Sequence, residues 1–402
     1  MEFDGIIRSG KPTGERPGQV PRRSSRRGST VSYSDVLMDH PAIGRPVLEL
    51  ITPAALVDLD WLEANIARMA AFFADKPAQL RPHVKTHRAP AIARMQIAAG
   101  AHGVTCAKVS MAEAMADGGI ADLFIANQVV SPPAIRRLAQ LATRTRVAVA
   151  ADDAGNVANL SAAAMTFGSR FDVLIEVDAG MGRCGTQPGE PTLALAKEIL
   201  RLPGLRFKGL HVYEGHVVQN DSREVRQTET VRMLERTMET RDLLQRNGLE
   251  VEVVTCGGTG TYDISGVYPG VTEHQSGSYV YMDPGYDVKT PGFHLALSIL
   301  CTVVSRPVPH KVVTDGGVQV MANDYGKPLV KSRPEILFRA LSEEHGNFLV
   351  REGDVTDLKV GDQVEVHPGH CCSCANLHDQ VYAVRGGNVE AVFKATARGK
   401  SQ

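Results

Sequence analysis

The sequence lacks an excess of charge of either sign. Its 402 residues include 44 Lys and Arg against 45 Asp and Glu, which leaves a formal net charge of −1. A nucleic-acid-binding protein would show a basic footprint, so we expect no nucleic-acid partner. Long apolar runs are also missing, because none reaches the ~20 residues that cross a bilayer. We therefore expect a globular protein without a membrane partner.

Paired cysteines are lacking as well. The seven Cys are an odd number without paired spacing, which argues against the disulfide framework of a secreted protein. The N-terminus has no hydrophobic segment of the kind found in a secretory signal. These absences favour a reducing compartment, and we predict a cytoplasmic location.

A polar leader is predicted at residues 1–35. Residues 5–30 are rich in Gly, Pro, Ser and Arg and lack apolar periodicity. Such a composition cannot bury enough surface to offset the entropy lost on ordering, so a mobile tail is expected. Its paired arginines could instead contact an anionic partner.

From residue 48 to 296, β-branched runs alternate with helical patterns. The eight runs are Leu80–Thr86, Gly103–Lys108, Asp122–Asn127, Arg146–Asp152, Phe171–Asp178, Phe207–Gly215, Val251–Gly258 and Gly277–Asp283. Eight strands alternating with helices are typical of a (β/α)8 barrel. An open, doubly wound sheet is the alternative. Residues 297–402 read instead as short alternating strands between Gly-Asp and Gly-Gly turns, which predicts a β domain. A strand from residues 47–59 could join it.

The predicted strand ends carry the candidate catalytic residues, because barrel active sites lie there. Lys85 ends the first run, and a lysine desolvated in an apolar mouth becomes a Schiff-base nucleophile. A surface lysine is the alternative. Arg183 follows the fifth run in a Gly-rich loop, and His211 and Tyr213 share one face of the sixth. His211 could equally be a core residue.

Two Gly- and hydroxyl-rich stretches surround the last two predicted strands. They contain Gly258 and Thr259 after the seventh run, and Gly277 and Ser278 at the eighth. Barrels often bind phosphate at the loops after strands seven and eight, so we predict a phosphate site here.

His and Cys residues at short spacing follow in residues 367–379. Imidazole and thiolate ligands suit Zn²⁺. In an extended segment His370 and Cys372 would face the same side, which suggests a two-ligand site completed by substrate or water. One alternative is a four-ligand structural zinc site that uses Cys374 or His378, and the other is a set of buried thiols without metal.

These stretches resemble the D-threonine aldolase and D-serine dehydratase family of fold-type III pyridoxal-phosphate enzymes. The resemblance runs from about Leu48 to the C-terminus and is carried by RPHVKTHR, IEVDAGMGRCGT, CGGTGTY, GSYVYMD and PGHCCSCANLHD. The loops and the ending ARGK are most similar to the 3-hydroxy-D-aspartate aldolases. The resemblance implies an alanine-racemase-like barrel with a β domain, pyridoxal phosphate as the cofactor, and a homodimer.

The resemblance also implies a role for each matching residue. Lys85 would hold pyridoxal phosphate covalently, Arg183 would face the pyridine nitrogen, and Tyr213 would lie beside the ring. The matches to the phosphate-binding stretches are Gly258, Thr259, Gly277, Ser278 and Tyr279. His370 and Cys372 match the metal pair that binds the substrate's β-hydroxyl. Lys85 and His370 are the predicted catalytic residues.

One position departs from the aldolase pattern. The aldolases of this family carry Asp two residues after the metal-binding His, whereas the dehydratases carry Cys, and this chain has Cys372. A thiolate favours Zn²⁺ over the harder Mg²⁺ and Mn²⁺. A metal on the β-oxygen can assist cleavage of the Cα–Cβ bond or make hydroxide a better leaving group, so the metal pair is compatible with both reactions.

We therefore predict a lyase that depends on pyridoxal phosphate and a divalent metal (Zn²⁺, or Mn²⁺ or Mg²⁺) and acts on D-3-hydroxy amino acids. Retro-aldol cleavage to glycine and an aldehyde is the leading hypothesis, and dehydration to a keto acid and ammonia is the alternative. A non-catalytic pyridoxal-phosphate-binding protein and a racemase are two more. The β domain with its His370–Cys372 pair argues against the binding protein, and a racemase would need another acid–base group at the barrel mouth.

Overall fold

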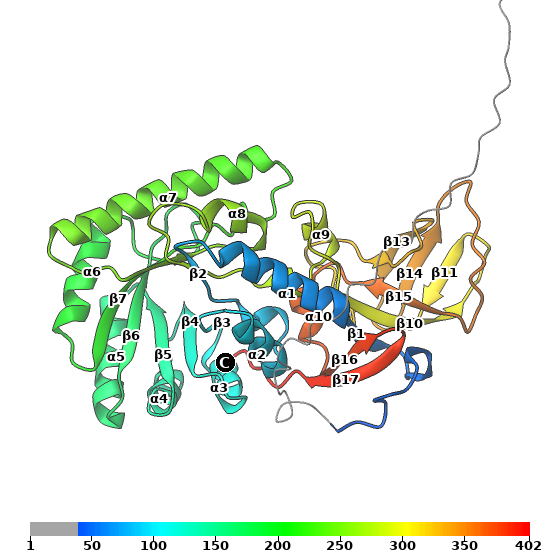
Figure 1. Ribbon diagram of the computed structural model, residues 1–402, viewed down its shortest axis with the longest axis horizontal. Coiled ribbons are helices and arrows are strands. Elements are labelled where there is room, and N and C mark those ends of the chain that lie inside the picture. The colour runs from blue at the N-terminus through cyan, green and yellow to red at the C-terminus, as the bar shows by residue number, and fades with distance from the viewer. Residues whose placement is uncertain (1–38) are drawn as a thin grey trace, which may run out of the picture. The chain divides into compact units, whose positions relative to one another are not determined.

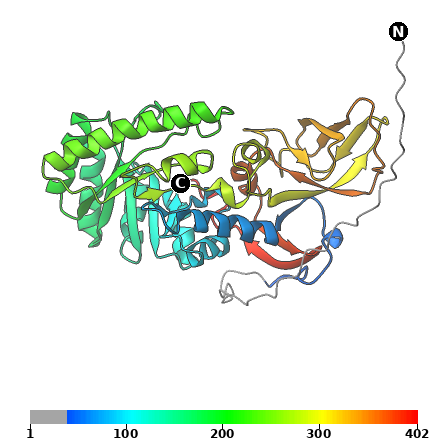
Figure 2. The ribbon, with the colours of Figure 1, turned by 45° about the horizontal axis from the view of Figure 1, so that its top comes forward.

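Two β-sheets organise the chain in the computed structural model, which describes residues 39–402. The leader predicted at residues 1–35 lies outside this range. Figure 1 shows the parallel sheet and its helices in cyan to green, and the second sheet mainly in yellow to red. The same arrangement is seen after a 45° turn in Figure 2. Within residues 39–402, none of the helices combines the length and the apolar character that crossing a membrane requires.

The first sheet is an eight-stranded parallel barrel. Its strands run in the order β2-β9-β8-β7-β6-β5-β4-β3. Their bounds are β2 (Gln79–Leu80), β3 (Val104–Cys106), β4 (Asp122–Gln128), β5 (Arg146–Ala151), β6 (Phe171–Glu176), β7 (Leu205–His211), β8 (Val253–Cys256) and β9 (Glu273–His274). A bridge between His83 and Thr105 joins the chain after β2 to β3, so the sheet closes on itself. The predicted (β/α)8 barrel is confirmed.

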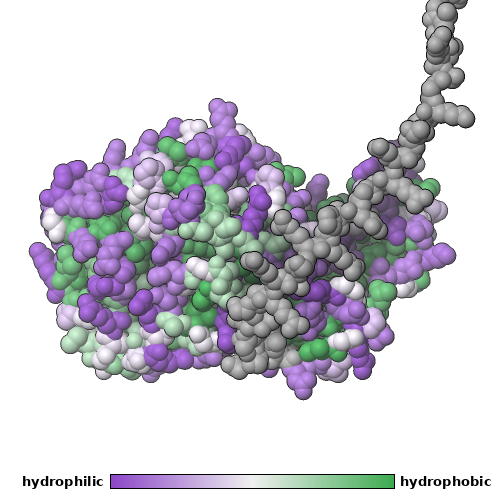
Figure 3. All heavy atoms as spheres, in the orientation of Figure 1, coloured by the Kyte–Doolittle hydropathy of each residue, from purple (hydrophilic) through white to green (hydrophobic). Residues whose placement is uncertain are grey.

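Four of the barrel helices begin where the sequence supplies a capping side chain, namely α1 (Leu59–Phe73), α4 (Pro132–Leu141), α5 (Ala154–Phe167) and α7 (Arg223–Arg246). Ser131 accepts the backbone N–H of Ala134 at 3.4 Å, and Asp153 accepts that of Asn156 at 2.7 Å. The other barrel helices are α2 (Pro90–Ala98), α3 (Val109–Asp117), α6 (Glu190–Arg201) and α8 (Tyr262–Ser265). Figure 3 shows mainly hydrophilic side chains around α6 and the adjoining part of α7, as expected of helix faces turned to solvent.

The second sheet is mostly antiparallel and has nine strands. Its main path is β13-β14-β11-β10-β1-β16-β17, with β15 also beside β10 and β12 beside β15. The bounds are β1 (Ala54–Asp58), β10 (Leu297–Ser305), β11 (Lys311–Thr314), β12 (Leu329–Val330), β13 (Ile336–Leu341), β14 (Gly346–Val350), β15 (Gln363–His367), β16 (Gln380–Arg385) and β17 (Asn388–Lys394). Strand β1 precedes the barrel in the sequence but lies between β10 and β16.

The prediction of the eighth barrel strand at Gly277–Asp283 was wrong. The strand is the short β9, and the 3-10 helix η5 (Ser278–Val280) occupies the region predicted as strand, which the helix α9 (Pro284–Asp287) follows. The N–H of Tyr279 donates to Thr259 Oγ1 at 3.0 Å instead of to a neighbouring strand. This segment is therefore tied to the loop after β8, where a polar site is expected.

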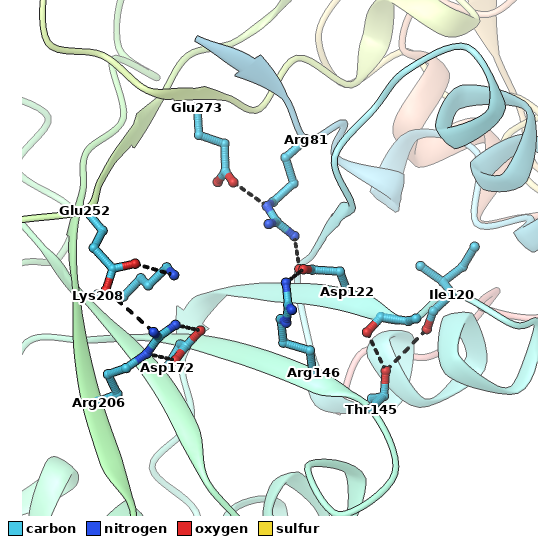
Figure 4. A network of polar contacts seen from close by, with 11 residues as sticks. Arg81, Ile120, Asp122, Thr145, Arg146, Asp172, Arg206, Lys208, Glu252 and Glu273 are labelled. Carbon is cyan, nitrogen blue, oxygen red and sulfur yellow. Dashed lines mark hydrogen bonds and ion pairs between the residues drawn. The ribbon is translucent and has the colours of Figure 1, made fainter. Parts of the chain in front are cut away.

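Ion pairs fill the end of the barrel where the parallel strands begin (Figure 4). Arg81 is buried and donates to Glu273 Oε2 and to Asp122 Oδ1, each at 2.6 Å. Asp122 also accepts from Arg146 at 2.9 Å. Charged side chains thus occupy this end of the barrel, and a cavity lies at the opposite end, where the strands finish.

Candidate active site

A cavity of about 590 Å³ lies at the carboxyl ends of the barrel strands. The predicted site residues that line it are Lys85, Arg183, Tyr213, Gly258, Thr259, Gly277, Ser278, His370 and Cys372. Tyr279 is not one of them. Its side chain is fully buried, and its hydroxyl accepts a hydrogen bond from Gln96 Nε2 at 2.8 Å. The cavity therefore gathers residues from the ends of seven barrel strands, or from the loops after them, and from the segment that follows β15.

Lys85 lies in the cavity wall. It belongs to the 3-10 helix η3 (Val84–Thr86), which begins directly after the bridge that closes the barrel. His83 Nδ1 accepts the N–H of Lys85 at 3.4 Å, and the N–H of His83 donates to the carbonyl of Ser276 at 3.3 Å. The barrel closure thus directs this lysine toward the cavity instead of toward the outer surface.

Arg183 is held by a buried carboxylate and an aromatic ring. Its Nη2 lies 3.1 Å from Glu176 Oε1, and its guanidinium lies 5.4 Å from the centre of the Tyr213 ring. Glu176, the last residue of β6, also accepts from Gln128 Nε2 at 2.6 Å. Burial would raise the pKa of Glu176, but His211 and the hydrogen-bond donors around it hold that pKa well below its ordinary value. Glu176 is therefore a carboxylate that fixes a cation at the cavity.

Two glycines shape the cavity wall after β8 and β9. A Cβ atom on Gly258 would lie 3.1 Å from Val218 Cγ1, and one on Gly277 would lie 2.6 Å from the carbonyl oxygen of His83. The contact between Thr259 and Tyr279 joins the two glycine-containing stretches. The close packing thus favours glycine at both positions, and the cavity wall there is backbone without a side chain.

His370 and Cys372 reach the cavity through the short helix α10 (Cys371–Ala375). The expectation of an extended segment was wrong: His370 is the extended N-cap residue, and Cys372 lies in the first turn of the helix. His370 Nδ1 lies 2.9 Å from Asp324 Oδ2, and Cys372 Sγ lies 3.2 Å from Thr86 Oγ1. Both side chains still line the cavity.

The surroundings of His370 and Cys372 favour the charged form of each side chain. Burial would lower the pKa of His370, but Cys372 and Asp324 raise it to about 9. A hydrogen bond from Cys371 and the positive charges of His370 and Lys85 lower the pKa of Cys372 well below its ordinary value, although burial opposes this. The sulfur is thus favoured as a thiolate, the form that binds a metal.

A four-ligand structural zinc site is not formed. Cys374 Sγ and His378 Nε2 both contact the carbonyl of Val320, at 3.5 and 2.8 Å. Across residues 39–402, no group of three or more His, Cys, Asp and Glu side chains could hold a metal ion. A metal at His370 and Cys372 would accordingly have two protein ligands.

Glu176 and Asp324 were not predicted as site residues. Asp324 lies 46 residues before His370, in a loop without a recognisable spacing to it. Glu176 is next to the Gly-rich loop of Arg183, so a carboxylate at the end of a strand was the available signal. Each acts through a predicted residue and is visible only from the folded arrangement.

Comparisons with known proteins agree with this geometry. The family model described as alanine racemase, N-terminal domain, matches residues 57–284, and that described as a putative serine dehydratase domain matches residues 296–384. A D-threonine aldolase from Arthrobacter sp is 38% identical over 368 residues, which cover 89% of this chain and 96% of that protein. A 3-hydroxy-D-aspartate aldolase from Paracoccus denitrificans (strain Pd 1222) is 38% identical over 381 residues, or 91% and 97% of the two chains.

Solved structures give the same picture. The crystal structure of D-threonine aldolase from Filomicrobium marinum has a TM-score of 0.87 and 38% identity, and the match covers 89% of this chain and 98% of that one. D-threo-3-hydroxyaspartate dehydratase from Delftia sp. HT23 has a TM-score of 0.78 and 27% identity over 87% and 98% of the chains. Two mutants of a dehydratase of that name replace a His and a Cys two positions later by Ala, the second in the metal-free form.

Proposed function

Because this chain belongs to the alanine-racemase-like family that includes D-threonine aldolase and 3-hydroxy-D-aspartate aldolase, we propose that it is a pyridoxal-phosphate-dependent lyase that cleaves D-3-hydroxy amino acids to glycine and an aldehyde. The predicted family and the prediction of a lyase are confirmed by these relatives, and a non-catalytic binding protein is not supported. One observation carries the proposal: Lys85 of the barrel and the His370–Cys372 pair line the same cavity.

The cavity fits pyridoxal phosphate in shape and in charge. A Cβ atom on Gly258 or Gly277 would crowd Val218 or collide with His83, so glycine leaves bare backbone at these two points of the cavity wall, as close approach to a phosphate requires. Arg183 supplies a fixed cation beside the Tyr213 ring. His211 is buried, and its Nδ1 has no hydrogen-bond partner within the described chain; the nearest carboxylate oxygen, of Glu176, lies 3.7 Å away. An unpaired polar atom at a cavity wall suits a site built for a polar ligand.

We assign the cofactor contacts as follows. Lys85 would hold pyridoxal phosphate covalently, Arg183 would face its ring nitrogen, and Tyr213 would lie beside the ring. Gly258, Thr259, Gly277 and Ser278 would bind its phosphate, with Tyr279 joining the two stretches through its backbone. When bound, pyridoxal phosphate supplies an electron sink for negative charge on the substrate's α carbon. A cation at the ring nitrogen keeps that nitrogen unprotonated, so Arg183 would moderate the sink.

The chain's own residues would then handle the proton and the β-hydroxyl. In this cleavage the β-hydroxyl loses a proton and the α carbon gains one when the Cα–Cβ bond breaks. Lys85 Nζ is the amine in the cavity wall, and we propose that it delivers the proton to the α carbon. His370 and Cys372 would hold a divalent metal beside the β-hydroxyl, because an imidazole and a thiolate together favour Zn²⁺ over Mn²⁺ or Mg²⁺. A metal bound there would supply Lewis-acid stabilisation of charge on the β-oxygen.

One observation favours a second candidate function, the dehydration of D-3-hydroxy amino acids. The mutated His and Cys of the solved dehydratase are spaced as His370 and Cys372 are, and its Cys mutant is metal-free. The aldolases are nevertheless more similar over the whole chain, at 38% identity against 29% for the dehydratase from Delftia sp. (strain HT23). Aldol cleavage therefore leads. A homodimer and a cytoplasmic location stay predictions of the sequence.

Product identity tests the proposal. The protein, loaded with pyridoxal phosphate and Zn²⁺ or Mn²⁺, is incubated with D-threonine, D-serine and the two D-3-hydroxyaspartate diastereomers, and glycine and ammonia are assayed in parallel. Glycine without ammonia is expected. Ammonia with a keto acid would support the dehydratase instead, and neither product from any substrate would overturn both. The Lys85→Ala protein serves as the inactive control.

A further inference from the structure

Glu214 is a fully buried carboxylate that the proposed function does not use. It follows β7, and none of its side chain is exposed. It does not line the cavity. A buried carboxylate is costly unless donors satisfy it, so its hydrogen-bond partners indicate what it holds.

The donors to Glu214 all come from the segment between β8 and β9. Oε2 accepts the backbone N–H of Gly257 at 3.2 Å. Oε1 accepts the hydroxyls of Thr261 at 2.7 Å and of Ser265 at 3.0 Å. One carboxylate thus joins the end of β8, the 3-10 helix η4 (Thr259–Thr261) and the helix α8.

The segment that Glu214 holds contains two residues of the cavity wall, Gly258 and Thr259. Thr261 links the carboxylate to this wall, because its Oγ1 lies 3.3 Å from both the N and the O of Gly258. Gly257 has a φ of +97°, and a Cβ atom there would lie 1.9 Å from His274 Nε2. The turn is therefore pressed against His274, which in turn contacts Ser265 Oγ at 3.0 Å.

We infer that Glu214 is a positioning residue for cofactor phosphate: it fixes the turn at Gly257–Thr261 from behind, so that Gly258 and Thr259 face the phosphate without rearrangement. The inference rests on the proposed use of pyridoxal phosphate. It predicts that Glu214 matters for the phosphate part of the ligand and not for the part that reacts with Lys85.

The test compares two ligands that differ only in the phosphate. Apo-protein is titrated with pyridoxal phosphate and with pyridoxal, and the visible absorbance gives both dissociation constants. Their ratio measures the contribution of the phosphate. In Glu214→Ala we expect this ratio to fall by about tenfold or more, because the turn loses its three anchoring hydrogen bonds. Pyridoxal itself should bind as it does to the wild type.

Two further variants separate positioning from general stability. Thr261→Val keeps the carboxylate but removes its link to Gly258, so its ratio should also fall, and it replaces Glu214→Ala if that protein does not fold. In Glu214→Gln the amide oxygen can accept from Gly257, while Thr261 and Ser265 donate to backbone oxygens they already contact. Its ratio should stay within about threefold of the wild type.

The matched control is Glu273→Gln, which changes a buried carboxylate at the opposite end of the barrel. It should lower the stability and leave the ratio unchanged. A wild-type ratio in Thr261→Val and in folded Glu214→Ala would overturn the inference, as would equal losses of affinity for both ligands. The proposed function itself fails if wild-type protein does not change the absorbance spectrum of either ligand. It also fails if Lys85→Ala changes these spectra as the wild type does.

Discussion

At the scale of single residues, Asp324 restricts how His370 can be used. Its Oδ2 lies 2.9 Å from His370 Nδ1 and accepts the hydroxyl of Ser373 at 2.7 Å. The ring of Tyr325 packs edge-on against His370, with centroids 4.8 Å apart. With Nδ1 engaged, Nε2 is the nitrogen left for a metal beside Cys372. A carboxylate that holds the second nitrogen of a metal-binding His fixes both its tautomer and its orientation.

Asp324→Ala should therefore weaken metal binding without removing a ligand. Loss of such an outer partner typically lowers metal affinity about 10- to 100-fold. Competition between the Zn²⁺-loaded protein and a chelator measures this independently of turnover. Asp354→Ala, which changes an exposed carboxylate in the part of the chain that contains the second sheet, should hold Zn²⁺ as the wild type does. Equal chelator resistance in Asp324→Ala and wild type would show that His370 needs no such support, or binds no metal.

Site residues were predictable from the sequence where neighbouring residues in the chain show their place at the end of a strand. Lys85 and Arg183 follow strands that their own neighbours identify, and both line the cavity. Glu214 and Asp324 were not assigned a role, because a lone acidic residue gives no sign of what it faces. Their partners lie 43 and 46 residues away in sequence, at Gly257 and His370. Only the folded chain brings them together.

At the scale of elements, the ion pairs where the barrel strands begin include one buried and one exposed arginine. Arg81 has a side chain only 8% exposed, between Glu273 and Asp122, whereas the Arg146 side chain is 68% exposed and contacts the same Asp122. Removing one partner of a buried pair leaves an unpaired buried charge, which costs about 3–5 kcal/mol. An exposed pair contributes about 0–1 kcal/mol.

Arg81→Met should accordingly lower the free energy of unfolding by about 3–5 kcal/mol at pH 7, and the control Arg146→Met by about 1 kcal/mol or less. Burial would raise the pKa of Asp122, but Arg81 and Arg146 lower it below its ordinary value. A carboxylate of this kind adds stability above its unfolded pKa of about 3.9 and loses it as the pH falls toward the folded pKa. The difference in the free energy of unfolding between Arg81→Met and the wild type should therefore become smaller below about pH 4.

Urea unfolding at several pH values between about 3 and 7 measures this difference. Equal losses of unfolding free energy in Arg81→Met and Arg146→Met would contradict the argument.

The elements were predictable to the extent that their own pattern formed them. The six runs from Gly103–Lys108 to Val251–Gly258 overlap β3 to β8. The eighth strand was misplaced because β9 is only Glu273–His274, too short to show alternation. Segment 277–283 is richer in β-formers, yet its backbone serves the cavity.

At the scale of the whole described chain, the two sheets share a core. One cluster of buried side chains includes Val57 of β1, Met233 of α7, Leu297 of β10, Cys371 of α10 and Tyr279 of η5. Strand β1 leads directly into α1, so the chain passes from the second sheet into the barrel and later returns. A site with Lys85 on one side and His370 on the other depends on this shared core, since small shifts between the sheets would move the two groups apart.

The shared core predicts that the barrel and the second sheet unfold together. The single tryptophan, Trp61, lies in α1 and stacks on His294, with ring centroids 3.9 Å apart. Next to it, Asn65 donates to the carbonyl of His294 and accepts its N–H, both at 2.8 Å. Trp61 fluorescence therefore reports on the junction that leads into β10, while far-UV circular dichroism reports on the whole chain.

Urea unfolding followed by both signals should give one midpoint, the usual test of a single cooperative transition. Asn65→Ala should lower the free energy of unfolding by about 1–3 kcal/mol, because the backbone groups of His294 lose their bonds to a fully buried side chain. The midpoint should move to lower urea in both signals together. Glu63→Ala on the same helix removes only an exposed ion pair with Arg385, so it should change the stability by no more than about 1 kcal/mol. If Asn65→Ala moved only the fluorescence transition, the junction would open on its own. The cavity between Lys85 and His370 would then be held by the barrel loops and α10, and not by the shared core.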